Sequence, residues 1–442
     1  MSVIAPIGSR IPARVLTGTY KQTEVGSLPK DWDVLNIGEL EPFVTSGSRG
    51  WAKYYSDIGD PFLRITNMSR ATIYLDLSDL KFVQLPARQS EAERTQLRSG
   101  DILISITADI GIIGYVDSRI PLPAYINQHI ALVRFDPART ENKFVSYFLA
   151  SEGPQKLFRS LTDQGAKAGM SLLTIRKIAI AHPSLGEQRA ISTALSDVDA
   201  LIRGLDKLIA KKRAIKLGSA QQLLTGKIRL NPFGPSCRQN KNTDVGCIPA
   251  DWEVKRLGDI GRCHIGLTFS PDCVAAEGHF VLRASNIGDY GLQFEDKLCV
   301  RMPIPEELVL REQDLLICVR NGSRPLIGKC ALVDSRAKGM TFGAFMSVFR
   351  SPRNRFAFHY FQSEMMKHQI HEHLGATINQ ITNKSLNSFH IALPPEDEQD
   401  AIASVLFDMD AEIMALERQR TKAVEIKQGM MQQLLTGRTR LI

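Results

Sequence analysis

The six-residue stretch QQLLTG occurs twice in this chain of 442 residues, at positions 221–226 and 432–437. The repetition extends well beyond it, because TEVGSLPKDWDV at 23–34 returns as TDVGCIPADWEV at 243–254. Three further pairs recur in the same order: LRITNM (63–68) with LRASNI (282–287), LRSGDILIS (97–105) with LREQDLLIC (310–318), and IAIAHPSLGEQRAISTAL (178–195) with FHIALPPEDEQDAIASVL (389–406). A repeat of this length is far longer than a solenoid unit and can form a core of its own. The sequence therefore predicts two related halves.

The composition limits the class of protein. A net charge of +8 and an isoelectric point near 9.1 suit a polyanionic partner such as nucleic acid, and they suit an ordinary basic surface equally well. The first residues lack the apolar segment of a signal peptide, and no apolar run is long enough to span a membrane. All seven cysteines lie between Cys237 and Cys330 without a C-x-x-C pair, which favours free thiols. We expect a cytoplasmic protein without membrane spans.

Each half contains a variable segment of mixed α/β character. The apolar runs DILISIT (101–107) and DLLICVR (314–320) have the length of strands, and Gly, Pro and Asp punctuate their surroundings. The segments 142–158 and 355–370 carry apolar residues at three- and four-residue spacing and are predicted to be helical.

The repeated segments that begin at Gly186 and Glu396 are predicted to be helical for roughly 40 residues, or about 60 Å at 1.5 Å per residue. Prolines precede both, and Gly226 and Gly437 are suitable stops. Their apolar residues alternate in steps of four and three, as in the seam of a coiled coil: Ile191, Leu195, Val198, Ile202, Leu205 and Ile209 in the first, and Ile402, Leu406, Met409, Ile413 and Leu416 in the second. Two equivalent amphipathic helices favour pairing with each other, which would make them a spacer between the variable domains.

The seam changes character farther along each helix. Charged residues occupy its later positions: Lys212, Lys216, Arg420 and Lys427. The apolar stripe is predicted to pass there to Ile215, Val424 and Met431, a break in phase that changes the local winding.

The start of the chain resembles the end of a half. VLTGTY (15–20) precedes TEVG much as LLTGKI (223–228) precedes TDVG, so the arrangement is cyclic and the termini are expected to lie close together. The predicted organisation is an N-terminal segment that completes the repeat (1–24), a first variable domain (25–182), a central helical region (183–230), a linker (231–244), a second variable domain (245–393) and a C-terminal helical region (394–442).

A search for catalytic chemistry finds no convincing motif. GSRPLIGKC (322–330) has the wrong spacing for a P-loop and ends in Cys, and no G-x-G-x-x-G loop follows a strand. NPFG (231–234) lacks the second proline of the adenine methyltransferase motif and is better read as a turn. In HQIHEH (368–373), His368 and His371 could share a helix face, but a solvated face is favoured because no third metal ligand is evident. The chain is expected to bind neither metal nor cofactor.

The paired motifs resemble those of the DNA-specificity subunit of Type I restriction-modification systems. The resemblance rests on the openings GSLPKDW and GCIPADW, the helix entries PSLGEQRAI and PPEDEQDAI, and the endings QQLLTGKIRL and QQLLTGRTRL. It implies an α+β fold in which two target recognition domains are joined by a pair of long antiparallel coiled-coil helices with pseudo-twofold internal symmetry. Each domain would read one half of a bipartite, asymmetric site in double-stranded DNA.

The same resemblance implies a non-catalytic subunit that directs others. Its partners would be two modification subunits, which carry S-adenosylmethionine and methylate adenine, and restriction subunits that use ATP and Mg²⁺. Two alternatives remain open: a DNA adenine methyltransferase with an unrecognised cofactor site, and a coiled-coil scaffold protein.

Candidate DNA contacts follow from the preference of Arg for guanine and of Asn or Gln for adenine. One set recurs in both halves, which favours a structural role at a strand end: Arg64, Thr66 and Asn67, with Arg283, Ser285 and Asn286. A second set does not recur and is better suited to reading different bases: Thr107, Asn127, Gln128 and Lys167, with Arg320, Asn321, Arg324, Asn379 and Gln380. RNGSRP (320–325) is the strongest of these. Lys211, Lys212 and Arg213 could meet phosphates or form only a solvated helix face.

Overall fold

The computed structural model describes residues 13–14, 19–86, 90–163, 169–234, 239–374 and 379–441. The chain divides into two compact units, unit 1 with residues 1–204 and 420–442, and unit 2 with residues 205–419. Each unit thus contains one part of each long helix. Among the described residues, no helix is both long and apolar enough to cross a membrane.

Unit 1 is built mainly from short antiparallel strands, four of which form the sheet β10-β9-β12-β5. A second sheet has the order β11-β7-β8-β6, in which β11 runs parallel to β7. The strands of unit 1 are β1 (Ala13–Arg14), β2 (Tyr20–Thr23), β3 (Gly26–Pro29), β4 (Asp33–Asn36), β5 (Phe43–Ser46), β6 (Tyr55–Ser56), β7 (Asp60–Leu63), β8 (Lys81–Val83), β9 (Ile102–Ser105), β10 (Ile113–Tyr115), β11 (Tyr125–Ile126), β12 (Ile130–Arg134), β13 (Ala179–His182) and β26 (Arg440–Leu441). Its short helices are α1 (Ser90–Thr95), α2 (Asn142–Ala150), α3 (Glu152–Asp163) and α4 (Leu172–Arg176).

Unit 2 repeats this topology. Its sheet β17-β24-β21-β22 corresponds strand for strand to β5-β12-β9-β10, and its second sheet has the order β18-β20-β19-β23. Its strands are β14 (Asn240–Thr243), β15 (Gly246–Pro249), β16 (Glu253–Arg256), β17 (Arg262–Ile265), β18 (Val274–Ala275), β19 (His279–Leu282), β20 (Cys299–Val300), β21 (Leu315–Cys318), β22 (Cys330–Leu332), β23 (Thr341–Phe342), β24 (Met346–Arg350) and β25 (His390–Leu393). Its short helices are α6 (Leu257–Ile260), α7 (Asn354–Phe361), α8 (Glu364–His373) and α9 (Asn383–Ser388). The predicted α+β class with an internal repeat is confirmed.

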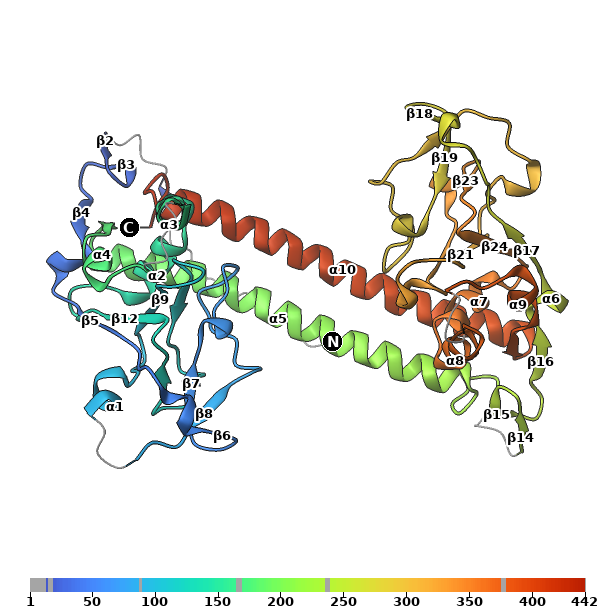
Figure 1. The fold of residues 1–442 in the computed structure, drawn as a ribbon, viewed down its shortest axis with the longest axis horizontal. Coiled ribbons are helices and arrows are strands. Elements are labelled where there is room, and N and C mark those ends of the chain that lie inside the picture. Colours follow the sequence, from blue (N-terminus) through green and yellow to red (C-terminus); the bar gives the residue numbers. More distant parts are fainter. Residues whose placement is uncertain are drawn as a thin grey trace. The chain divides into compact units, whose positions relative to one another are not determined.

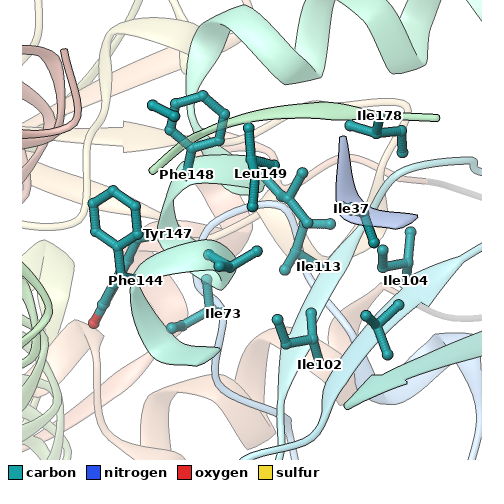
Figure 2. Close-up of a cluster of buried hydrophobic side chains, with 14 of the residues drawn as sticks. Ile37, Ile73, Ile102, Ile104, Ile113, Phe144, Tyr147, Phe148, Leu149 and Ile178 are labelled. Carbon is teal, nitrogen blue, oxygen red and sulfur yellow. The ribbon is translucent and has the colours of Figure 1, made fainter. Parts of the chain in front are cut away.

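The core of unit 1 lies between helix α2 and the first sheet. Phe144, Phe148 and Leu149 of α2 belong to the same buried cluster as Ile104 of β9 and Ile113 of β10, and Figure 2 shows Leu149 next to Ile113. All five side chains are almost fully buried. Removing a side chain of this size from water contributes about 1.5–3 kcal/mol, which explains why apolar residues recur along α2 at helical spacing.

The segments 142–158 and 355–370, each predicted to be one helix, are each divided between two helices. Helix α2 ends at Ala150, and Ser151 adopts an extended conformation before α3 begins. Its hydroxyl donates to the carbonyl of Phe148 at 2.6 Å. Ser363 does the same between α7 and α8, where its hydroxyl donates to Tyr360 at 2.6 Å and caps the main chain of α8. Serine competes for main-chain hydrogen bonds in this way, so a single residue ends one helix and permits the next.

Helices α5 (Leu185–Leu224) and α10 (Glu396–Leu434) have 40 and 39 residues and are drawn in green and red in Figure 1. In unit 1, buried Ile191 and Leu195 at the start of α5 belong to the same apolar cluster as Leu434 at the end of α10. Asp199 also pairs with Lys427 at 2.8 Å. The two helices therefore run antiparallel in this unit.

The helices pair with the same polarity in unit 2. Lys216 of α5 pairs with Asp410 of α10 at 2.6 Å, and Arg213, which precedes Lys216, pairs with Glu417, which follows Asp410. Helix α5 ends at Leu224, in the apolar cluster that also contains the first residues of the α10 seam. The predicted antiparallel pairing is thus present within each unit.

The predicted seam residues lie between the helices or against the sheets. Seven are buried: Ile191, Leu195, Leu205, Ile209, Ile402, Leu406 and Ile413. The others are partly buried: Val198, Ile202, Met409 and Leu416. The predicted passage of the stripe to Ile215 is wrong, because that side chain is 45% exposed. Lys212 and Lys216 keep the seam positions instead, and their ammonium groups pair with Glu412 and Asp410 across it.

One seam contact differs between the units. Tyr147, the sixth residue of α2, donates its hydroxyl to Asp199 at 2.7 Å. The sixth residue of α7 is His359, which is 3% exposed. Burial, together with the charge of nearby Lys216, lowers the pKa of His359 to about 3. The folded protein therefore favours the neutral imidazole well below the ordinary pKa of histidine.

Candidate nucleic-acid interface

The repeated motifs of unit 1 meet at one buried arginine near the end of the chain. The guanidinium of Arg440 donates to the Glu187 carboxylate at 2.5 and 2.8 Å and to the Asp31 carboxylate at 2.8 and 3.0 Å. It also lies 5.7 Å from the ring of Trp32, whose indole N–H donates to Glu187 at 3.1 Å. This pairing lowers the pKa of Asp31. The opening motif, the helix entry and the final motif are thus held together by one side chain.

Unit 2 builds the same junction around Arg229. Its guanidinium donates to Glu398 at 2.6 and 2.9 Å and pairs with Asp251 at 2.8 Å. The neighbouring glutamines repeat as well, since Gln188 and Gln399 donate to the carbonyls of Pro183 and Pro394 at 2.8 and 2.7 Å. The most strongly repeated residues therefore have structural roles.

The two stop glycines close these junctions. Gly226 and Gly437 have φ angles of +67° and +65°, in the left-handed region that glycine adopts most readily. A Cβ atom on Gly437 would lie 2.4 Å from the ring of Pro29. Beside it, strand β1 pairs antiparallel with β26, so described residues near both ends of the chain lie side by side.

A second repeated arrangement surrounds the end of the central strand of each first sheet. In unit 1, the main-chain N–H of Ile106 donates to the carbonyl of His129 at 2.9 Å, and that of Met170 donates to Ile106 at 2.8 Å. In unit 2, Val319 donates to Phe345 at 3.0 Å, and Ile381 donates to Val319 at 2.8 Å. We call this arrangement the strand-end frame; it comprises residues 106–107, 127–130 and 169–170 in unit 1, and 319–320, 343–346 and 380–381 in unit 2.

Close backbone packing makes the frame rigid. Gly47 donates to the carbonyl of Ile130 at 3.0 Å, and its counterpart Gly266 donates to Met346 at 3.0 Å. A Cβ atom on Gly47 would lie 2.1 Å from the carbonyl oxygen of Asn127, and one on Gly266 would lie 2.1 Å from that of residue 343. Only glycine permits this approach, so the frame adopts the same main-chain course in both units.

The side chains on the frame differ between the units. In unit 1, the Thr107 hydroxyl lies 2.5 Å from Nδ1 of His129, and the Gln128 amide lies 3.1 Å from its Nε2. In unit 2, the Arg320 guanidinium lies 4.8 Å from the centre of the Phe345 ring, which is 53% exposed. One rigid backbone thus presents two unlike sets of groups that could contact a ligand.

Comparison with known families accounts for both repeated halves. The family described as "Type I restriction modification DNA specificity domain" matches residues 29–211 and again residues 249–426. The chain belongs to this family. The resemblance stated from the repeated motifs is confirmed.

Relatives in this specificity family match over nearly the whole chain. The protein "Putative type I restriction enzyme MjaX specificity subunit" of Methanocaldococcus jannaschii is 28% identical over 433 residues, which cover 96% of this chain and 97% of the relative. The crystal structure of a Type-I restriction-modification system S subunit from M. genitalium shares the fold, with a TM-score of 0.57, 14% identity and coverage of 91% and 96% of the two chains. A chain from a study of complex assembly and conformational transition of the type I R-M system has a TM-score of 0.51, 17% identity and coverage of 93% and 99%.

The recurring Arg-x-x-Asn residues cap a turn in this specificity domain. In unit 1, Asn67 is 2% exposed; its oxygen accepts from the main chain of Arg64 at 2.9 Å, and its amide donates to the carbonyls of Asp76 and Asp79 at 2.9 and 3.2 Å. The Arg64 guanidinium pairs with Asp79 at 3.0 Å. Thr66 lies between them and is exposed.

Unit 2 contains the same turn. Asn286 is fully buried and receives the main-chain N–H of Arg283 at 2.8 Å. Arg283 and Ser285 donate to the two oxygens of Asp296 at 2.6 and 2.5 Å. The predicted DNA contacts at Asn67 and Asn286 do not fit this geometry, because both amide protons of each side chain already have partners.

The nonrecurring residues gather at the strand-end frame. Thr107, Asn127 and Gln128 belong to it in unit 1, and the main chains of Arg320 and Gln380 form a bridge in unit 2. Asn379, beside Gln380, is exposed. Lys167 lies outside the described residues.

The predicted loop RNGSRP continues from the frame. Asn321 accepts the main-chain N–H of Ser323 at 2.8 Å, and Arg324 donates to the carbonyl of His371 at 3.4 Å. Their side chains therefore take part in shaping the loop, whereas Arg320 is the exposed arginine of this segment.

The basic run of α5 contributes mainly to contacts within unit 2. Arg213 donates to Glu417 at 2.6 Å and to the Tyr290 hydroxyl at 3.2 Å, and these partners raise its pKa. Lys212 pairs with Glu412 at 2.7 Å. Lys211 is exposed.

On the predicted histidine face, Nε2 of His368 lies 3.2 Å from the Glu372 carboxylate on the same helix. His371 is exposed on the same helix. In the part of the chain that the structure describes, no three His, Cys, Asp or Glu side chains gather as metal ligands.

Two residues of the strand-end frame, His129 and Phe345, were not among the DNA contacts predicted from the sequence. His129 and Phe345 each directly precede a buried strand, β12 or β24. An alignment of QHIALVRF (128–135) with AFMSVFRS (344–351) would have placed them at one position with unlike chemistry.

Proposed function

We propose that this chain is the sequence-specific DNA-binding subunit of a Type I restriction-modification complex, in which each unit reads one half of a bipartite, asymmetric site. The carrying observation is the strand-end frame: a backbone repeated in both units presents Thr107 and His129 in one and Arg320 and Phe345 in the other. A duplicated reader with unlike side chains suits a site whose two halves differ. The net charge of +8 suits contact with phosphates.

The proposed organisation follows the repeat. Target recognition domains at 25–182 and 245–393 alternate with helical regions at 183–230 and 394–442, the segment 231–244 is a linker, and the segment 1–24 completes the cycle. The paired helices would set the spacing of the two half-sites. The proposed DNA contacts are those predicted residues that still have accessible groups: Thr66, Thr107, Asn127, Gln128, Arg320, Asn321, Arg324, Asn379 and Gln380. Ser285 and the basic residues Arg64, Arg283 and Lys211 would have supporting roles. Lys167, which lies outside the described residues, stays in the proposal on the sequence alone.

The chain would not itself catalyse a reaction. Two modification subunits would supply S-adenosylmethionine and methylate adenine, and restriction subunits would use ATP and Mg²⁺, all in the cytoplasm. Purified chain mixed with S-adenosylmethionine and DNA is expected to transfer no methyl groups. Transfer without any partner would overturn this part of the proposal.

Methylome sequencing of the source cell tests the main proposal. A split motif with methylated adenine on both strands should disappear when the gene for this chain is deleted and return when it is restored. An unchanged methylation pattern in the deletion strain would refute the assignment.

A further inference from the structure

The strand-end frame separates what is shared between the units from what differs. The main-chain hydrogen bonds match within 0.1 Å, at 2.9 Å from Ile106 to His129 and 3.0 Å from Val319 to Phe345. The side chains at the same positions differ: Thr107 and His129 in unit 1 correspond to Arg320 and Phe345 in unit 2. A position with constant geometry and variable chemistry is where duplicated readers can acquire different targets, in contrast to the turn residues that both units retain.

Several arginines of unit 2 are held by carboxylates. Arg283 pairs with Asp296, Arg336 with Asp334 and Arg350 with Asp314. Over the described residues, no carboxylate lies within pairing distance of Arg320, and its guanidinium rests on the face of Phe345 instead. A ring can hold the planar guanidinium in place while leaving its N–H groups free to donate.

The Phe345 ring lies at the surface: 53% of the residue is exposed although it directly precedes the buried strand β24. The main chain on both sides is fixed, since Phe345 accepts from Val319 and Gly343 accepts from Met346 at 2.8 Å. The ring is therefore presented to solvent by a rigid loop and is not left out of the core by disorder.

The counterpart in unit 1 offers only hydrogen bonds. His129, Thr107 and Gln128 form a chain of contacts at 2.5 and 3.1 Å. Both ring nitrogens of His129 have partners in these contacts, whereas the Thr107 hydroxyl and the Gln128 amide keep further capacity to donate or accept, as base edges in the major groove require.

Building on the proposed function, we propose that residues 320 and 345 form the base-reading pair of unit 2, and residues 107 and 128 that of unit 1. In unit 2, the forked guanidinium of Arg320 donates to O6 and N7 of a guanine, while the Phe345 ring contacts the methyl group of an adjacent thymine. In unit 1, Thr107 and Gln128, held in place by His129 between them, read a base edge by hydrogen bonds alone. These pairings follow the preferences of Arg for guanine and of apolar groups for the thymine methyl.

The test uses the complete complex in the source cell, with Arg320→Ala and Phe345→Ala introduced separately and the methylated motif determined by sequencing. Arg320→Ala should reduce discrimination at one guanine by about 5- to 150-fold, the range for one bidentate contact of about 1–3 kcal/mol. Phe345→Ala should relax the neighbouring thymine. The half-site read by unit 1 should remain unchanged in both variants.

Matched variants separate reading from folding and charge. Arg336→Ala removes a second arginine that rests on a ring of the same unit, 4.9 Å from Phe294, and should leave the motif unchanged. Arg320→Lys keeps the charge and should still lose the guanine preference. Thr107→Ala with Gln128→Ala should relax only the other half-site.

Three results would overturn the inference while leaving the proposed function intact. These are an unchanged motif in both Arg320→Ala and Phe345→Ala, a weakening of methylation that is equal at all sequences, and retention of the guanine in Arg320→Lys. The proposed function itself fails if the unmodified cell carries no split motif that depends on this chain.

Discussion

Replacing Arg440 with alanine should destabilise unit 1 selectively. Arg440 lies in the short strand β26, yet its guanidinium joins the start of α5 through Glu187 to the opening motif through Asp31 and Trp32. The variant removes all of these contacts at once. It also leaves the Glu187 carboxylate, which is 4% exposed, with the Trp32 indole as its one side-chain donor among the residues that the structure describes.

The expected loss can be estimated from the burial of the two acids. Leaving one partner of a buried ion pair uncompensated costs about 3–5 kcal/mol. Asp31 is 64% exposed and adds little, because solvent screens its pairing. The estimate for Arg440→Ala is therefore about 3–5 kcal/mol, equivalent to an increase of about 150- to 5,000-fold in the equilibrium constant for opening.

Hydrogen exchange measured by mass spectrometry resolves the effect by unit, because local opening exposes amides to exchange. Peptides from the start of α5 and from β4 should exchange faster in Arg440→Ala, and peptides from unit 2 should not. Arg229→Ala is the matched control and should give the opposite pattern, since Arg229 pairs with Glu398, whose side chain is fully buried. A loss below about 1 kcal/mol, as for a surface pair, or equal acceleration in both units would refute the reasoning.

Three further outcomes are expected. The pKa of His359 is about 3 in the folded protein and near 6.5 in the unfolded chain, so the unfolded chain takes up an extra proton as the pH falls between these values. The free energy of unfolding of unit 2 should therefore fall by about 2 kcal/mol between pH 7 and 5. In urea titrations, His359→Phe should abolish this pH dependence. Gly437→Ala should lower the stability of unit 1 by more than 1 kcal/mol, whereas Gly429→Ala, with open space at a helical site, should raise it by about 0.5–1 kcal/mol; equal effects in thermal unfolding would contradict the assigned clash. Inserting one heptad into both α5 and α10 should widen the unspecified gap in the methylated motif, and an unchanged gap in a folded variant would count against the spacer role.

The repeated motifs made the fold predictable. Alternating steps of four and three residues indicated both long helices, and the structure begins them at Leu185 and Glu396, one residue or less from the predicted starts. The same pattern could not predict that Ile215 is exposed. Lys216 keeps the seam position because its ammonium group pairs with Asp410, and residue spacing alone does not reveal that pairing. Apolar periodicity indicates a face, and the partner of that face decides which residues fill it.

The candidate interface was less predictable. Arg64 and Asn67 have the residue types that read bases, and their recurrence suggested a cap, but only the hydrogen bonds of Asn67 distinguish the two roles. Phe345 belongs to no recognisable motif. Its exposure depends on its position directly before β24, which the sequence alone does not reveal.

The sequence by itself determined the family, the two α+β halves and the two long helices, because these depend on repetition and on apolar periodicity, which can be recognised directly along the chain; the antiparallel pairing was implied by the family resemblance. Only the tertiary structure decided which residues meet: Arg440 with Glu187 and Asp31, and Arg320 with Phe345. Contacts between residues far apart in sequence depend on the course of the backbone in space, and that course is fixed by the packing of whole sheets and helices and not by any short motif.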